Sequence, residues 1–215
     1  MNNSPNFQAT IDWYSQNAEK YAQWVDDYYS SEQITTFISM LPQQAKILDA
    51  GCGSGRDTKF FTNSGFDATG LDAAEGMIKT ATRNNPNSKF VVGDFRQLQF
   101  PDNTFQGVWS HASLINLETV QEVQLALKEF YRVLAPEGIL HALVKLQVGE
   151  HKVILSEDKE SNGKRIVHYF QEDEFKALLQ QAGFTPIIVE TYTEDERNPR
   201  GRPNVSWIHT LSKKA

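Results

Sequence analysis

The chain contains a single cysteine, Cys52, in 215 residues, and this scarcity excludes several kinds of site. One thiol cannot form an internal disulfide, and it cannot supply the two thiolates of a cysteine-based zinc site. The sequence therefore indicates no metal site, and it fits a protein of the reducing cytoplasm.

Long apolar runs and an excess of positive charge are also lacking. No uninterrupted apolar stretch approaches the roughly 20 residues that a helix needs to cross a bilayer, and the first residues do not resemble an export signal. Lys and Arg number 21 against 27 Asp and Glu, and the net charge of -6 disfavours attraction to nucleic acid or anionic lipid. We expect a monomer or homodimer with neither a membrane nor a nucleic-acid partner.

The apolar pattern divides the chain into three parts, which we expect to form one domain over residues 1–215. Residues 1–43 have helical spacing and predict a helical cap. Residues 44–148 alternate short apolar runs with amphipathic stretches, as in a parallel sheet covered by helices. Residues 149–215 predict a substrate-side insertion and C-terminal strands. The runs that predict strands in the central part are 46–50, 68–71, 90–92, 106–110 and 138–146.

The second half of the chain contains further elements. Apolar residues at helical intervals predict helices over 119–134 and 172–182, each followed by a glycine that can end a helix. Period-two alternation predicts strands over 186–192 and 204–211, the last one antiparallel and near the sheet edge. The polar stretches 149–164 and 194–203 have neither period and predict loops or insertions.

The strongest chemical signal is a glycine-dense turn that follows a buried strand, within residues 47–57. Gly51, Gly53 and Gly55 permit positive backbone dihedral angles and let a ligand lie against bare main chain. Their strict alternation differs from the Gly-x-Gly-x-x-Gly spacing that places a pyrophosphate on a helix. Asp49 would repel a pyrophosphate, but it could hold the ammonium group of an amino-acid-bearing cofactor or position the turn. A tight turn without a ligand is the structural alternative.

Carboxylates also follow the next two predicted strands. Asp72 ends the second strand, where it can accept hydrogen bonds from ribose hydroxyls or cap the following helix. Asp94 and Phe95 end the third strand, and such a pair suits an adenine, with the carboxylate on the exocyclic amine and the ring beside the base.

In this order the three motifs resemble those of the class I S-adenosylmethionine-dependent methyltransferases, over residues 47–146. The resemblance implies an α/β, Rossmann-like fold with helices on both faces of a seven-stranded, mostly parallel sheet. The expected strand order is 3-2-1-4-5-7-6, with strand seven antiparallel. Residues 133–138 also look like the turn that leads into strand five, except that Glu137 replaces a glycine.

Two segments look like bacterial small-molecule and tellurite-resistance-type methyltransferases: Gly-Ser-Gly-Arg-Asp at 53–57 and Trp-Ser-His-Ala-Ser-Leu at 109–114. The resemblance implies S-adenosylmethionine as cofactor, S-adenosylhomocysteine as product and a small-molecule acceptor methylated on O, N or S. It places Arg56 near the cofactor carboxylate, or else in solvent. Residues 14–21 resemble the amino-terminal helix that folds over the cofactor in many relatives, which places Tyr14 or Tyr21 near the methionine portion, or else in the core. The residues with expected cofactor-binding roles are Tyr21, Asp49, Gly51, Cys52, Gly53, Gly55, Arg56, Asp72, Ala73, Met77, Asp94, Phe95, Ser110 and His111.

Methyl transfer from a sulfonium needs alignment and exclusion of water more than it needs a catalytic constellation. A base matters only for an acceptor that is protonated, and His111, at the end of the fourth predicted strand, is the candidate. Two alternatives remain open: a protein that binds S-adenosylmethionine without methylating anything, and a nicotinamide-dependent oxidoreductase on the same sheet.

Overall fold

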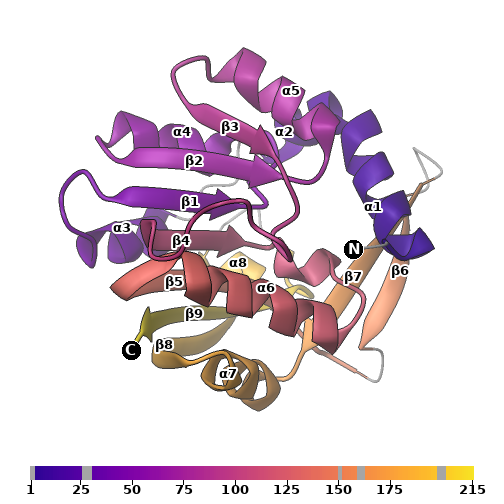
Figure 1. Cartoon of the computed structure of the whole chain (residues 1–215). Coiled ribbons are helices and arrows are strands. Elements are labelled where there is room, and N and C mark those ends of the chain that lie inside the picture. Colours follow the sequence, from indigo (N-terminus) through magenta and orange to yellow (C-terminus); the bar gives the residue numbers. More distant parts are fainter. Residues whose placement is uncertain (1–2, 26–30, 150–151, 159–162, 198–201) are drawn as a thin grey trace.

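A mixed nine-stranded sheet forms the centre of the computed structural model, which describes residues 3–25, 31–149, 152–158, 163–197 and 202–215 (Figure 1). Strand β1 has four buried residues in succession, three of them apolar. Such burial is typical of a middle strand in a sheet that is covered on both faces. The strands are β1 (Lys46–Ala50), β2 (Asp67–Asp72), β3 (Lys89–Val92), β4 (Phe105–His111), β5 (Leu134–Leu146), β6 (Val153–Asp158), β7 (Gly163–Phe170), β8 (Phe184–Thr193) and β9 (Ser206–Lys214).

The first five strands are parallel in the order β3-β2-β1-β4-β5. Strand β9 runs antiparallel along β5, and β8 pairs with the outer side of β9. If β8 and β9 are counted as strands six and seven, the predicted order 3-2-1-4-5-7-6 with an antiparallel strand seven is confirmed. Strand β9 therefore lies inside the sheet, one position from the edge.

The hairpin of β6 and β7 raises the strand count from the expected seven to nine. It is joined to the sheet where Lys145 and Leu146 of β5 pair with Tyr169 and Phe170 of β7. The prediction of a loop over 149–164 is wrong for 153–158 and 163–164. The pairing partners of this polar segment lie downstream in β7, so its own composition does not reveal the strand.

Helices cover both faces of the sheet (Figure 1). On one face, α6 and α7 pack through Leu127, Phe130 and Phe175, which are fully buried. On the other face, α3 and α4 pack Phe37 and Phe61 around Trp109 of β4. The helices are α1 (Pro5–Gln16), α2 (Ala18–Val25), α3 (Ser31–Ser39), α4 (Arg56–Asn63), α5 (Glu75–Asn84), α6 (Val120–Val133), α7 (Glu172–Gln181) and α8 (Glu194–Arg197), with a 3-10 turn, η1, at Leu114–Asn116.

Local sequence sets the ends of the two helices that matter most for the site. The hydroxyl of Ser4 accepts a hydrogen bond from the Phe7 amide, and this cap starts α1. Thr119 and Glu122 form a reciprocal capping box at the start of α6. Of the stretch 194–203 that was predicted as a loop, residues 194–197 form the short helix α8, and 198–201 lie outside the described residues.

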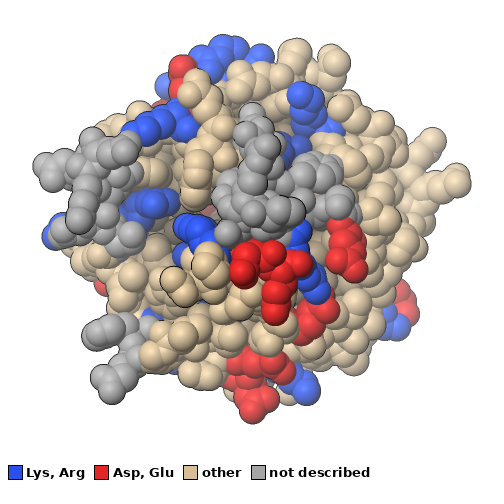
Figure 2. All heavy atoms as spheres, turned by 180° about the vertical axis from the view of Figure 1, so that it is seen from behind, with Lys and Arg blue, Asp and Glu red and all other residues tan. Residues whose placement is uncertain are grey.

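Acidic and basic side chains lie side by side on the face shown in Figure 2, where neither sign forms a continuous surface among the coloured residues. No helix in the described parts of the chain is both long and apolar enough to cross a bilayer.

Candidate functional site

A cavity of about 500 Å³ lies at the carboxyl ends of the parallel strands. Open parallel sheets bind ligands at this edge, and the volume is within the usual range for small-molecule sites. Residues that follow β1, β2, β3 and β4 line its floor, and Phe7, Thr10 and Ile11 of α1 line it from above. The N-terminal helical segment therefore closes the cavity over the strand ends.

The glycine loop after β1 forms one wall. Gly51, Gly53 and Gly55 all have positive φ, and a Cβ atom on Gly53 would meet no other atom within 4 Å. The amides of Gly51 and Cys52 donate to the carbonyl of Leu71, and the amide of Gly55 donates to that of Cys52. These amides are used within the protein, so the loop does not offer them as a phosphate nest.

Asp72 connects the loop to the second strand end. Its Oδ2 accepts from the Gly53 amide at 3.0 Å, and its Oδ1 accepts from the Ala74 amide at 2.8 Å. The carboxylate thus steadies both the glycine loop and the start of α5 while it lines the cavity. Each oxygen keeps a further lone pair for a ligand hydroxyl, so the capping role and the proposed ribose role are compatible.

Three ionisable side chains, Arg56, Asp57 and Asp49, lie close together beside the loop. Arg56 donates to both oxygens of Asp57, at 2.7 and 3.0 Å, and also to the Val25 carbonyl. Burial alone would raise the pKa of Asp57, but this ion pair lowers it to about 2. Burial, together with the charge of Asp57, raises the pKa of Asp49 to about 8, so Asp49 is largely protonated at neutral pH.

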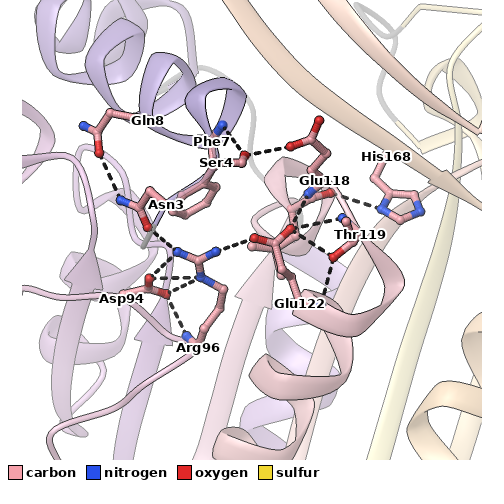
Figure 3. Close-up of polar contacts among 11 residues, drawn as sticks. Asn3, Ser4, Phe7, Gln8, Asp94, Arg96, Glu118, Thr119, Glu122 and His168 are labelled. Atoms are coloured by element: carbon pink, nitrogen blue, oxygen red, sulfur yellow. Dashed lines mark hydrogen bonds and ion pairs between the residues drawn. The ribbon is translucent and has the colours of Figure 1, made fainter. Parts of the chain in front are cut away.

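Asp94 and Phe95 follow β3 and line the cavity as expected. The Asp94 carboxylate also forms an ion pair within the protein, with Arg96 (Figure 3). The buried guanidinium of Arg96 binds both Asp94 oxygens and Glu122, donates to the Asn3 side chain, and lies 3.9 Å from the centre of the Phe7 ring. Arg96 therefore fastens the start of α1 to the strand end that supplies Asp94. In α1 and the residue before it, Asn6 and Ser4 add hydrogen bonds to Glu118, each 2.7 Å long.

Aromatic rings from the N-terminal helices form another part of the cavity wall. Tyr14, Tyr21 and Trp24, from α1 and α2, line the cavity and contact one another edge to face, with the two tyrosine centroids 5.2 Å apart. Burial raises the pKa of Tyr21, which stays neutral. Such rings can attract a cation through their π faces.

His111, at the end of β4, lines the cavity near the loop. Its Nδ1 lies 3.4 Å from Nε2 of His141, and burial lowers the pKa of His111 to about 4. The imidazole is therefore neutral at physiological pH, with a free lone pair, but it is a weaker base than an exposed histidine. Burial and the neighbouring carboxylates raise the pKa of the Cys52 thiol, so this thiol is not a thiolate nucleophile.

The structure brings most of the predicted site residues to one cavity. Those that line it are Tyr21, Asp49, Gly51, Cys52, Gly53, Arg56, Asp72, Ala73, Asp94, Phe95 and His111. Three described residues of the predicted set lie just outside it. A Cβ on Gly55 would meet the Phe90 ring at 2.6 Å, Met77 packs on Ala18 and Ala74, and Ser110 pairs its hydroxyl with that of Ser113.

Two residues that line the cavity, Gln33 and Tyr192, were missed by the sequence analysis. Gln33 from α3 donates to the Tyr192 hydroxyl of β8 at 3.0 Å. No motif marks these positions, because they reach the cavity only through the packing of α3 and the β8–β9 hairpin. Within the described residues, no group of His, Cys, Asp and Glu side chains is arranged to hold a metal ion.

Residues 48–142 match a family model described as a methyltransferase domain. Among curated proteins, a demethylmenaquinone methyltransferase from Renibacterium salmoninarum is 35% identical over 103 residues, which are 48% of this chain and 42% of that protein. The matched part of the chain thus spans less than half the length of this relative.

Solved structures share the fold over almost the whole chain. The 1,6-didemethyltoxoflavin-N1-methyltransferase of Burkholderia thailandensis, bound to its substrate and S-adenosylhomocysteine, has a TM-score of 0.75 and 22% identity, over 100% of this chain and 92% of that one. The [4+2]-cyclase SpnF has a TM-score of 0.65 and 18% identity, over 85% of this chain and 80% of that one. Identities this low show the fold alone.

Proposed function

We propose that this chain, whose residues 48–142 form a class I, Rossmann-like methyltransferase domain, transfers a methyl group from S-adenosylmethionine to a small molecule in the cytoplasm. One observation carries the proposal. The glycine loop, Asp72 and the Asp94–Phe95 pair, which end three successive strands, line one cavity together with the aromatic rings of Tyr14 and Tyr21.

The residues present fit the cofactor. A methionine portion could lie beside Gly53, where a Cβ atom would meet no other atom within 4 Å, and Asp72, which lines the cavity, could accept hydrogen bonds from a ribose. Phe95 offers a ring to adenine. Tyr14 and Tyr21 supply π faces to a sulfonium. A nearby ammonium group would lower the raised pKa of Asp49 and ionise it on binding.

The bound cofactor would supply an activated methyl group, and the chain's own residues would do the rest. The N-terminal helices, which supply part of the cavity lining, would limit the access of water, and the strand ends would hold the two reactants in line. Neutral His111 accepts the proton of an O–H, N–H or S–H acceptor as the new bond to the methyl carbon forms.

A direct test is to incubate the protein with S-adenosylmethionine and panels of phenols, amines, carboxylic acids and thiols, and to follow S-adenosylhomocysteine by mass spectrometry. The proposal predicts stoichiometric S-adenosylhomocysteine and methylated product with at least one class. His111→Ala should lower the rate by about 100-fold for an acceptor that must lose a proton. Cofactor binding without any product in every panel would contradict the transfer step.

A second candidate is a protein that binds the cofactor for another purpose. The fold supports this alternative as well, since one neighbour with the same fold is named a [4+2]-cyclase. Binding without turnover would favour it. A nicotinamide-dependent oxidoreductase is disfavoured, because the loop amides are bonded within the protein and Asp49, Asp57 and Asp72 lie where a pyrophosphate would approach.

A further inference from the structure

A row of three histidines leads from the cavity to the protein surface across four adjacent strands. His111 ends β4, His141 lies in β5, His209 lies in β9, and Glu190 of β8 is the register partner of His209. His141 and His209 are 0% and 2% exposed, whereas the side chain of Glu190 is 40% exposed. The row therefore connects the candidate base with solvent.

The contacts along the row use the ring nitrogens in a regular order. The Glu190 carboxylate lies 2.7 Å from Nδ1 of His209, and Nε2 of His141 lies 3.4 Å from Nδ1 of His111. The remaining nitrogens, Nε2 of His209 and Nδ1 of His141, are buried without a partner among the described residues. The ring centroids of His141 and His209 are 5.0 Å apart, which is short enough for one N–H···N hydrogen bond between these two nitrogens after a small rotation of the rings.

The surroundings hold the rings in place and keep them neutral. The Trp109 ring stacks on His141 with 3.5 Å between centroids, and its Nε1 donates to Asp57. Burial lowers the pKa of all three histidines, so each ring carries one donor and one acceptor.

The charged groups that face the two ends of the row come from other elements. Asp57 and Arg56 of α4 face His111, and their charges act on it in opposite directions. Arg197 of α8 and Glu32 of α3 face His209, in addition to Glu190 of β8. Arg197 also pairs with the Glu190 carboxylate at 2.9 Å.

We propose that Glu190, His209 and His141 are positioning residues that keep the proton of His111 on Nδ1 and remove the proton released during methyl transfer. The inference rests on the proposed function. A carboxylate can only accept, so it makes Nδ1 of His209 a donor and Nε2 an acceptor, and the same polarity repeats at His141 and His111. Nε2 of His111, which has no hydrogen bond within the described residues, then presents a lone pair to the cavity.

The proton count balances along the row. When the acceptor forms its bond to the methyl carbon, its proton passes to Nε2 of His111. The Nδ1 proton of His111 moves to Nε2 of His141, and the Nδ1 proton of His141 moves to Nε2 of His209. Finally the Nδ1 proton of His209 moves to Glu190, which releases it to water. Each imidazole ends neutral but in the opposite tautomer. After the product leaves, the transfers run in reverse: water protonates Glu190, each proton moves back one position along the row, and Nε2 of His111 releases its proton to water in the cavity.

The test needs no cofactor or acceptor. Long-range proton–nitrogen NMR spectra of the uniformly labelled free protein distinguish a protonated ring nitrogen from one with a free lone pair. We expect a protonated Nδ1 in His111, His141 and His209. In Glu190→Gln and in His209→Phe, the Nδ1 signal of His111 should shift toward the unprotonated region, because the polarity of the row is no longer fixed.

His168→Phe is the matched control, because His168 is buried and binds the Leu117 carbonyl but lies outside the row. It should leave the His111 signals unchanged. A wild-type His111 with its proton on Nε2 would overturn the proposal, and so would unchanged His111 signals in both row variants or an equal shift in His168→Phe. Calorimetry with S-adenosylhomocysteine on the same samples tests the proposed function separately, since lost binding in the wild type leaves the tautomer result intact.

Discussion

At the scale of single residues, the cavity depends on carboxylates whose partners the sequence does not reveal. The glycine loop and the aspartates at strand ends were predicted from spacing, because such motifs are local. The ion pair that holds Asp57 ionised and the burial that keeps Asp49 protonated depend on packing between α4, β1 and β4. The sequence thus predicted which residues meet at the cavity but not their charge states.

Asp49 gives a pH-dependent prediction. Its pKa is raised from 3.8 to about 8, so between these values the folded chain holds a proton that the unfolded chain has lost. This group therefore makes the folded state less stable as the pH rises through that window. Relative to wild type, Asp49→Asn should raise the melting temperature more at about pH 8 than at about pH 5.

Thermal unfolding at the two pH values, followed by circular dichroism, measures this difference. Asp67→Asn, a change to an exposed carboxylate at the start of β2, is the control and should show no such trend. An equal effect of Asp49→Asn at both pH values would show that Asp49 is ionised in the folded chain.

Asp72 gives a prediction on binding. Asp72→Asn keeps the size of the side chain and one acceptor oxygen, but it removes the charge that strengthens hydrogen bonds from ribose hydroxyls. We expect the binding free energy of S-adenosylhomocysteine to weaken by about 1.5–3 kcal/mol, the usual value for hydrogen bonds to a charged group. Calorimetry measures this, with Asp67→Asn from the other end of the same strand as control. Unchanged affinity would remove Asp72 from the ribose site.

At the scale of elements, the attachment of α1 controls how the cavity is closed. The place of helix α1 follows from Arg96, whose partners Asn3, Asp94 and Glu122 come from three separate segments (Figure 3). The sequence predicted a helical cap in this region, but no motif marked Arg96 as the residue that holds it. The β6–β7 hairpin was missed for a related reason, since its partner residues are distant from the polar stretch.

Arg96→Met tests this attachment. Methionine fills similar space but leaves Asp94 and Glu122 without their cation, which should lower the free energy of unfolding by about 3 kcal/mol. Amide hydrogen exchange in α1 should become faster than in α6 and α7. Arg83→Met, which breaks the exposed pair with Glu19 between α5 and α2, should cost less than about 1 kcal/mol. If both variants behave alike, the Arg96 network does not hold α1.

At the scale of the whole molecule, the order of the sheet was predictable because each parallel strand is a short apolar run followed by a turn signal. The topology then places all carboxyl ends of β1 to β4 at one edge, which explains why motifs far apart in the chain share one cavity. Other parts of the cavity wall were not predictable, because Gln33 and Tyr192 come from elements that no motif relates to the cofactor loops.

The most direct test of the central claim is isothermal titration of the full chain with S-adenosylmethionine and S-adenosylhomocysteine, beside the nicotinamide dinucleotides. The account predicts one site per chain, with affinity in the micromolar range or better, for the two sulfur compounds and no heat of binding for the dinucleotides. Binding of a dinucleotide alone, or no binding of any of these compounds, would contradict the assignment of this cavity to S-adenosylmethionine.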